Sequence, residues 1–264
     1  MGTIITRLPY VSADAAALSP LDITDAEIAL YNSGMVSAWY RAADGWDESA
    51  GLTDRMGSTT RLAPVTVAPT RTDMAAYNGK PALVYGAEGA SSGDMRAAGK
   101  LPTNSSFTIA LVGRHGPSDN ANLVGNDNDA GLTVISQSSL GAFTFLIGGT
   151  TVQTNTGTVS SYYRPYAGGP SLVLASWDND AKSSSFRIQR GEYERISTTG
   201  FGAVVNTEGT LHVGAAGTAS SGRVGGGDIA EIMILPVALH ATAHADLRAT
   251  IEDYLGTRYG IAAP

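Results

Sequence analysis

The strongest constraint on the fold lies near the end of the sequence, where an apolar segment precedes an amphipathic one. Residues 228–235 read DIAEIMIL and are apolar at nearly every position from Ile229 onward, apart from Glu231. An apolar run of this length is typical of a strand in the middle of a sheet that is covered on both faces. Pro236 ends the run. We therefore predict a central strand with a packed layer on each side.

The segment after Pro236 has the pattern of a single amphipathic helix. Apolar side chains recur at i, i+4, i+7 and i+8, and charged side chains occupy the other side. The apolar positions are Leu247, Ile251, Tyr254 and Leu255, and the charged positions are Arg248, Glu252 and Asp253. A single helix after many strands is expected to seal one face of the sheet.

The composition favours short strands over long charged helices. Of 264 residues, 32 are Gly, 7% are aromatic and 16% are charged. A chain of this length allows one large sandwich or two small domains, and we favour one domain with an arm. The formal net charge is −7 and the 17 Lys and Arg residues are scattered, which argues against a nucleic-acid partner or a membrane surface. The absence of cysteine excludes disulfides, thiolate metal sites and cysteine nucleophiles.

The first nineteen residues contain an apolar cluster at Ile4, Ile5, Leu8, Tyr10 and Val11. They lack the basic segment and continuous apolar run of a Sec signal peptide. No segment of the sequence approaches the roughly 18 apolar residues that span a bilayer, so we expect no membrane insertion. Two interpretations remain: a frayed terminus, or an extended arm that docks on another subunit, because the cluster is too apolar for a solvated tail.

A short helix and about eleven strands are predicted between this segment and the C-terminal pair. Thr24 to Glu27 has the pattern of a capping box that opens a helix over residues 25–32, and Gly34 closes it. Turn residues then separate strand-like runs with no alternating helices, which favours an antiparallel sandwich. The runs are 35–40, 61–67, 81–85, 106–114, 121–124, 131–136, 142–147, 171–177, 184–190, 210–213 and 228–235.

Six segments occur in the order found in concanavalin A-like, laminin-G-like jelly rolls, which the chain resembles over residues 35–261. They are MVSAWY at 35–40, LTDRMG at 52–57, YNGKPALVYG at 77–86, FTIALV at 107–112, LVLASWD at 172–178, and DIAEIMIL at 228–235 with the helix that ends in YLGTRYGI at 254–261. The resemblance implies two curved sheets whose concave face and rim loops often bind carbohydrate or another protein. It implies no reaction.

We therefore predict an all-β fold: an antiparallel jelly-roll sandwich of the concanavalin A-like lectin/glucanase type, with a short N-terminal helix and a C-terminal closing helix. The predicted division is an arm with the short helix over residues 1–34, used for anchoring and assembly, and a lectin-like β-sandwich over residues 35–264.

Patterns that could carry catalysis are weak. Glycoside hydrolases of this fold place two carboxylates at neighbouring positions of one strand. In this sequence Glu192 and Glu194 follow a strand beside a turn, Glu231 stands alone, and Glu252 and Asp253 point outward from the last helix. We predict that the protein is not an enzyme.

Two further short motifs favour structural interpretations. Residues 89–93 match the nucleophile-elbow pattern, but small residues and Gly on both sides indicate a loop. His240 and His244 have a spacing that can place two imidazoles on one metal, but no third ligand is evident, so we favour a solvated helix end.

Two kinds of loop are candidate binding sites. Asp127 and Asp129 offer oxygen ligands for calcium, with a hairpin turn as the alternative, and no other cofactor is indicated. Aromatic rings in loops can stack on sugar faces, although subunit contact is the alternative for the tyrosine loop. The candidate carbohydrate-binding residues are Trp46, Tyr162, Tyr163, Arg164 and Tyr166. Trp39 and Trp177 lie in strand runs and are assigned to the core.

A lectin-like sandwich normally meets its ligands outside the cell, yet this chain has neither a Sec signal nor cysteine. A protein of a bacteriophage or phage-like particle, made in the host cytoplasm and exposed on the virion surface, reconciles these facts. We expect a non-enzymatic capsid decoration, head spike or tail fibre whose arm contacts other virion proteins. It would form a homo-oligomer and touch host-surface polysaccharide through its rim loops. The alternatives are a free carbohydrate-binding module and, third, a glycan hydrolase.

Overall fold

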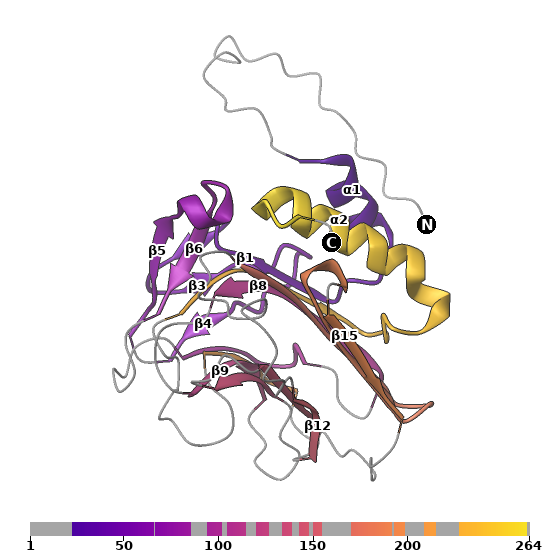
Figure 1. Ribbon diagram of the computed structural model, residues 1–264. Helices are drawn as coiled ribbons and strands as arrows, with labels where there is room; N and C mark the ends of the chain where they lie inside the picture. Colours follow the sequence, from indigo (N-terminus) through magenta and orange to yellow (C-terminus); the bar gives the residue numbers. More distant parts are fainter. Residues whose placement is uncertain are drawn as a thin grey trace.

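Two antiparallel sheets face each other, and two helices cover the outer face of one of them (Figure 1). This arrangement, seen in a computed structural model, confirms the predicted all-β jelly-roll sandwich with an N-terminal and a closing helix. The structure describes residues 23–65, 67–85, 94–101, 105–114, 120–126, 134–138, 143–147, 150–154, 170–191, 193–198, 209–214 and 227–262.

The helix-covered sheet has eight strands within the described residues. They are β1 (Ala38–Arg41), β5 (Thr70–Asp73), β6 (Pro81–Val84), β8 (Phe107–Arg114), β13 (Ser171–Asp178), β14 (Ser183–Ile188), β15 (Tyr193–Ser197) and β17 (Asp228–Leu235). Their order is β15-β14-β13-β8-β17-β6-β5, and β1 also pairs with β17. The predicted central strand is therefore confirmed, because β17 lies between β8 on one side and both β6 and β1 on the other.

The second sheet has seven strands in the described part of the chain. They are β4 (Ala63–Pro64), β7 (Met95–Ala97), β9 (Asn120–Gly125), β10 (Val134–Ser138), β11 (Phe143–Ile147), β12 (Thr150–Thr154) and β16 (Leu211–Val213), in the order β12-β11-β10-β9-β16-β7-β4. A separate hairpin is formed by β2 (Trp46–Asp47) and β3 (Gly51–Leu52). The short 3-10 helices are η1 (Ala75–Tyr77), η4 (Gln189–Gly191) and η5 (Thr242–His244).

Two apolar layers explain why the central strands are apolar at successive positions. In β8, Ile109 and Leu111 belong to the core between the sheets, whereas Ala110 and Val112 belong to the core beneath the helices. Because both faces of this strand are buried, alternation with polar residues is lost. Trp177 is buried in the core between the sheets and Trp39 in the core beneath the helices, as predicted.

Helix α1 (Asp25–Asn32) begins and ends where the sequence predicts. The Thr24 hydroxyl accepts a hydrogen bond from the Glu27 amide, and the Glu27 carboxylate accepts one from the Thr24 amide. Gly34 follows the helix with a φ of +66°. Leu30 is buried in the same apolar cluster as the closing helix. The division at residue 34 stays a prediction, and the arm residues Ile4, Ile5, Leu8, Tyr10 and Val11 lie outside the described residues.

Helix α2 (Ala245–Tyr259) lies over the first sheet, as Figure 1 shows, and its predicted apolar stripe packs into the core beneath it. Ile251, Tyr254 and Leu255 are buried. The outward orientation predicted for Glu252 is wrong, because its carboxylate is buried and lies 2.5 Å from Nε of Arg187 on β14. Within the described residues, no helix is long and apolar enough to cross a bilayer.

Each of the eleven predicted strand runs overlaps an observed strand, but the patterns do not predict β2, β3, β5, β7, β12 or β15. Two of these are the edges of the helix-covered sheet, and their sequences are polar. β5 is exposed along its whole length and carries Arg71 and Asp73, and β15 carries Glu194 and Arg195. Charged edge strands discourage pairing with another chain, and their side chains hide the apolar alternation on which strand prediction depends.

The close approach of β3 to the Leu62 segment makes a glycine necessary at position 51. Gly51 has a φ of +82°, and a Cβ there would overlap the Leu62 carbonyl oxygen. Leu52 and Leu62 exchange backbone hydrogen bonds of 2.9 and 3.0 Å beside it. We predict that Gly51→Ala lowers the free energy of unfolding by at least about 3 kcal/mol, because backbone strain and a backbone clash add.

The matched control is Gly57→Ala. Gly57 has nearly the same φ, +81°, but a Cβ there meets nothing within 4 Å. We expect this variant to lose about 1 kcal/mol, since only the conformational cost remains. Urea unfolding followed by tryptophan fluorescence measures both values, and equal losses would contradict the clash.

Candidate functional site

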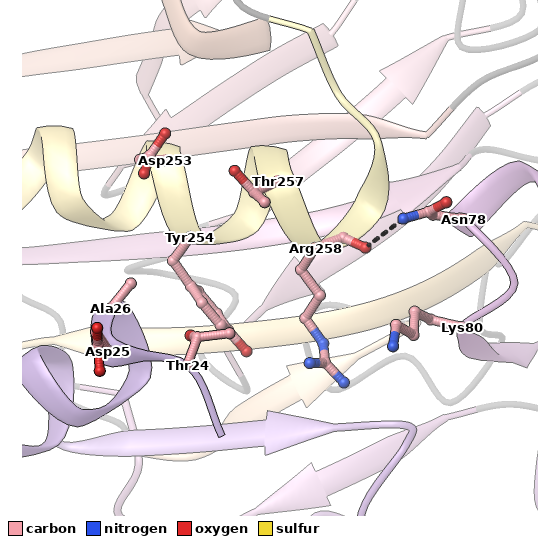
Figure 2. A pocket seen from close by; sticks show the side chains of 9 residues that line it. All are labelled: Thr24, Asp25, Ala26, Asn78, Lys80, Asp253, Tyr254, Thr257 and Arg258. Carbon is pink, nitrogen blue, oxygen red and sulfur yellow. Dashed lines mark hydrogen bonds between the residues drawn. The ribbon is translucent and has the colours of Figure 1, made fainter. Parts of the chain in front are cut away.

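A pocket of about 420 Å³ lies where the two helices meet the turn before β6 (Figure 2). Three segments far apart in the sequence form it: the start of α1, the turn that follows η1, and the last turns of α2. The residues that line it are Thr24, Asp25, Ala26, Asn78, Lys80, Asp253, Tyr254, Thr257 and Arg258. Most of them carry a hydrogen-bonding side chain, and polar groups of this kind can fix the orientation of a ligand.

Local structure fixes the position of the polar groups in the pocket wall. Asn78 adopts a left-handed backbone conformation with a φ of 54°, and its amide nitrogen donates to the Arg258 carbonyl oxygen at 3.4 Å. Thr24 is the N-cap of α1, held by the capping box. Lys80 immediately precedes β6. The wall is therefore built on helix ends and a tight turn rather than on a long loop.

Tyr254 connects the pocket to a buried network of polar groups beneath it. Figure 2 shows its side chain running from α2 toward the strands. Its hydroxyl donates to Glu231 on β17 at 2.9 Å and accepts a hydrogen bond from Nη1 of Arg41 at 3.0 Å. The floor of the pocket is consequently held by the sheet.

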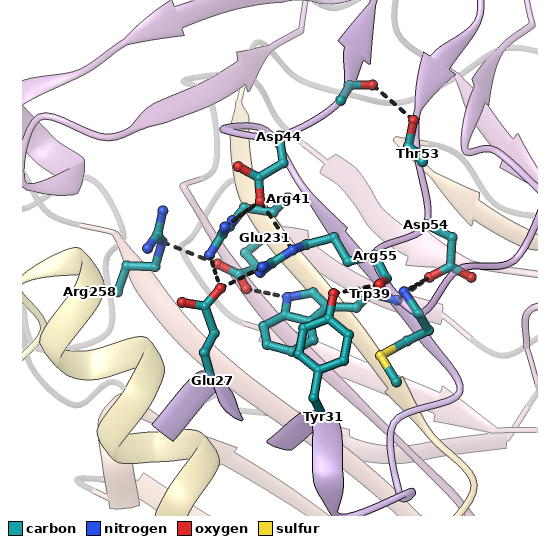
Figure 3. A network of polar contacts seen from close by, with 12 residues as sticks. Glu27, Tyr31, Trp39, Arg41, Asp44, Thr53, Asp54, Arg55, Glu231 and Arg258 are labelled. Atoms are coloured by element: carbon teal, nitrogen blue, oxygen red, sulfur yellow. Dashed lines mark hydrogen bonds and ion pairs between the residues drawn. The ribbon is translucent and has the colours of Figure 1, made fainter. Parts of the chain in front are cut away.

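Glu231 lies at the centre of this network (Figure 3). Its carboxylate accepts hydrogen bonds from the Trp39 indole and from the hydroxyls of Tyr254, at 2.9 Å, and Tyr259, at 2.5 Å. Nε of Arg258 lies 3.8 Å away. Burial raises the pKa of Glu231, and the charge of Arg41 opposes that rise.

A second buried carboxylate, Glu27 of α1, faces two arginines in Figure 3. It lies 2.7 Å from Nη1 of Arg41 and 2.6 Å from Nη2 of Arg55. Burial opposes its ionisation, but the charges of Arg41 and Arg55 outweigh that effect and hold the pKa of Glu27 below its ordinary value. The Arg55 guanidinium also stacks over the Trp39 ring at 4.4 Å. Arg41 and Arg55 both reach Asp44 as well.

His240 is not at a solvated helix end, which corrects another prediction. Its two ring nitrogens each lie 2.9 Å from a serine hydroxyl, of Ser183 and of Ser176. Burial lowers its pKa, so the ring is held neutral among these hydroxyls. Among the residues that the structure describes, no group of three or more His, Cys, Asp and Glu side chains could hold a metal ion.

The predicted ligand-binding residues are not part of the pocket as far as the structure describes them. Trp46 lies in strand β2 rather than in a loop, half-buried against the core between the sheets. Tyr162, Tyr163, Arg164 and Tyr166 lie outside the described residues, as do the calcium candidates Asp127 and Asp129. Their roles stay predictions.

Sequence reasoning did not find the pocket, although some of its parts carried signals. The capping box at Thr24 is predicted from the sequence, and residues 77–86 belong to a segment that carries the jelly-roll resemblance. The pocket exists because these elements meet α2, and that contact leaves no local pattern. Tyr254 was assigned to the apolar stripe, which is correct, but its hydroxyl is also the link to Glu231.

No family model matches this chain, and no curated protein matches it. Solved structures share its fold. Botulinum neurotoxin type C, for which interaction with two ganglioside molecules is described, aligns with a TM-score of 0.59 at 10% identity over 84% of this chain and 51% of that one.

Two further solved structures show the same similarity. The botulinum neurotoxin serotype D/C binding domain aligns with a TM-score of 0.57 at 11% identity, covering 87% of this chain and 53% of that one. The binding domain of botulinum neurotoxin DC in complex with rat synaptotagmin II aligns with a TM-score of 0.56 at 11% identity, covering 85% and 52%. The alignments thus span about half of each toxin chain, and at this identity they establish the fold alone.

The paired charges beneath the pocket make stability depend on Glu27. We predict that Glu27→Gln lowers the free energy of unfolding at pH 7 by about 3 kcal/mol, because two arginines lose a buried counter-charge while the amide still caps α1. The lowered pKa of Glu27 means that its contribution is present above its ordinary pKa and is lost as the pH falls through its folded pKa. The difference between the two proteins should therefore shrink as the pH falls below about 4.

Urea unfolding at pH 7 and pH 3.5 tests this prediction. The control is Asp253→Asn, which neutralises a carboxylate that is 68% exposed and 3.1 Å from Arg190. A solvated pair of this kind is worth less than about 1 kcal/mol. A loss in Glu27→Gln as small as that of the control would contradict the importance of the buried pair.

Proposed function

We propose that this chain is a non-catalytic recognition domain on the surface of a bacteriophage or phage-like particle, where it binds a host glycan or protein. The fold supports this proposal, because toxin chains that share it are described as interacting with gangliosides and as bound to synaptotagmin II. Those ligands belong to the toxins. For this chain we infer only the same kind of task, recognition of a cell-surface molecule.

The observation that carries the proposal is the contrast between the pocket and the buried carboxylates. The carboxylate of Glu231 is engaged by Trp39, Tyr254 and Tyr259, and it lies beneath the pocket floor. A carboxylate held by three donors is poorly placed to exchange protons with a substrate. The accessible part of the pocket instead presents groups suited to hold a ligand.

Those groups match the needs of a polyhydroxylated ligand. Thr24 and Thr257 offer hydroxyls, Asn78 an amide, and Lys80 and Asp253 opposite charges. Sugar hydroxyls both donate and accept hydrogen bonds, so a wall of mixed donors and acceptors suits a glycan. In the same proposal the residues Trp46, Tyr162, Tyr163, Arg164 and Tyr166 form a second contact with glycan, and Asp127 and Asp129 bind calcium.

The assembly part of the proposal concerns the N-terminal arm over residues 1–34. Its apolar residues anchor the domain to other virion proteins, and the domain works as a homo-oligomer made in the host cytoplasm. A free carbohydrate-binding module is the second candidate, because the fold and pocket fit it equally well without a particle. Mass spectrometry of purified particles separates the two, and failure to find the chain would favour the second.

A glycan array probed with the full chain tests recognition. We predict that Lys80→Ala weakens binding of the preferred glycan at least about tenfold, because the substitution removes a charged donor and with it a hydrogen bond to the glycan. The matched control is Lys182→Ala, since Lys182 is exposed in the turn between β13 and β14, far along the chain from the pocket. The control should bind like the unchanged protein.

The other outcomes each remove part of the proposal. Loss of binding in Tyr163→Ala with full binding in Lys80→Ala would move the site from the pocket to the tyrosine loop. Absence of binding to any glycan, together with capture of a host-surface protein, would leave protein recognition. Cleavage of a bound glycan would overturn the non-catalytic role.

A further inference from the structure

The charged residues of the pocket lie at different depths. Four of the nine lining residues carry a charge: Asp25, Lys80, Asp253 and Arg258. The two carboxylate residues, Asp25 and Asp253, are exposed to solvent. Lys80 is only partly exposed, and the Arg258 side chain is 8% exposed. The enclosed part of the pocket is therefore lined by cations, and its mouth is acidic.

The two cations come from separate elements and extend toward the same part of the pocket. Lys80 immediately precedes β6, and Arg258 lies in the last turn of α2. Figure 2 shows their side chains converging, whereas the Asp253 carboxylate points away from them and Asp25 lies on the other side of Tyr254. One end of the pocket is thus suited to a negatively charged group.

Building on the proposed function, we infer that the pocket recognises the carboxylate of an acidic sugar, such as a uronic acid at the end of a glycan. A guanidinium can donate two parallel hydrogen bonds to a carboxylate, and an ammonium adds a compact positive charge. Because Arg258 is mostly buried and Lys80 half-buried, their attraction for an anion is screened less than that of charges on an open surface.

Contacts below the pocket hold Arg258 in position. Its Nε lies 3.8 Å from the Glu231 carboxylate, and its guanidinium lies over the Tyr259 ring, 5.8 Å from the ring centre. A guanidinium has five N–H donors, so a contact at Nε is compatible with a bidentate contact to a ligand. A cation that is already oriented loses less conformational entropy when a ligand binds.

The acidic mouth limits the charge of the ligand. Asp25 and Asp253 are exposed there, and the chain as a whole has a formal net charge of −7. These charges repel a glycan with many sulfate or phosphate groups more strongly than one with a single carboxylate. The volume of about 420 Å³ is in the lower part of the range of about 300–1,000 Å³ for small-ligand pockets, which suits the end of a glycan chain.

Matched pairs of oligosaccharides on the array test this inference. The two members of a pair differ only in the terminal sugar, which is glucuronic acid in one and glucose in the other. A carboxylate thus replaces a hydroxymethyl group, and the rest of the ligand is unchanged. We expect the acidic member to bind at least about tenfold more tightly at low ionic strength, and the preference to decrease as salt is added.

The first variant is Lys80→Gln, which removes the charge but keeps a hydrogen-bond donor. We expect binding of the acidic member to weaken at least about fivefold, and binding of the neutral member to change less than about twofold. The matched control is Lys182→Gln, in the exposed turn between β13 and β14, which should keep the full preference. An unchanged melting temperature shows that each variant is folded.

The second variant, Asp25→Asn, removes a negative charge from the mouth. We expect it to bind the acidic member about two- to threefold more tightly, because a repulsive charge is lost. Binding of the neutral member should stay the same. Weaker binding of the acidic member in this variant would contradict the repulsion assigned to the mouth.

The remaining outcomes separate this inference from the proposed function. Equal binding of the acidic and neutral members would overturn the preference for a carboxylate and leave glycan recognition intact. An equal loss for both members in Lys80→Gln would do the same, because Lys80 would then act without its charge. Tighter binding of a sulfated glycan than of the carboxylated one would also overturn it. Absence of binding to every glycan would remove glycan recognition itself, and the preference with it.

Discussion

Buried charged groups lie where the two helices pack on the first sheet, a region that we call the seam. Their pairing fixes the position of the helices on the sheet. Glu27 and Glu231 are both inaccessible to solvent, and each is surrounded by donors from other elements. A buried carboxylate without partners costs several kcal/mol, so the helices are held in an arrangement relative to the sheet in which both carboxylates have partners. Arg41 joins the two carboxylates, because it contacts Glu27 directly and reaches Glu231 through Tyr254. Tyr254 and Arg258 belong both to this seam and to the pocket wall, so the contacts of the seam also hold the wall in place.

Some parts of the fold can be predicted from the sequence and others cannot. The buried strands β8 and β17 and the cap of α1 follow from local patterns: apolar runs, and a threonine with a glutamate three residues later. The edge strands β5 and β15 do not, because their sequences are shaped by exposure to water. Glu252 shows a further limit. Its place on the polar side of α2 predicts exposure to solvent, but its carboxylate forms an ion pair with Arg187 of β14. The pattern of residues along a helix does not reveal which side chains of the sheet lie beneath it.

The candidate site was less predictable than the fold, and the reason is sequence separation. Trp39 and Glu231 are 192 positions apart, and Arg41 and Tyr254 are 213 positions apart. No short motif predicts such contacts, whereas segments rich in tyrosine or aspartate are easily found in a sequence. Sequence reasoning therefore favoured residues 162–166 and 127–129, and the structure adds a pocket composed of ordinary residues brought together by the closing helix. Glu231 was noticed only as an isolated charge, although an acidic residue in an otherwise apolar strand is itself a signal of a buried partner.

The charged edge strands of the helix-covered sheet affect how copies of the chain meet at high protein concentration. Arg71 and Asp73 on one outermost strand, and Glu194 and Arg195 on the other, would be stripped of water if two copies met side by side. Cross-β stacking between molecules is thereby penalised even when they are crowded. Pairing of the backbone edges of two copies is therefore disfavoured, and each sandwich is protected from the most direct route to aggregation.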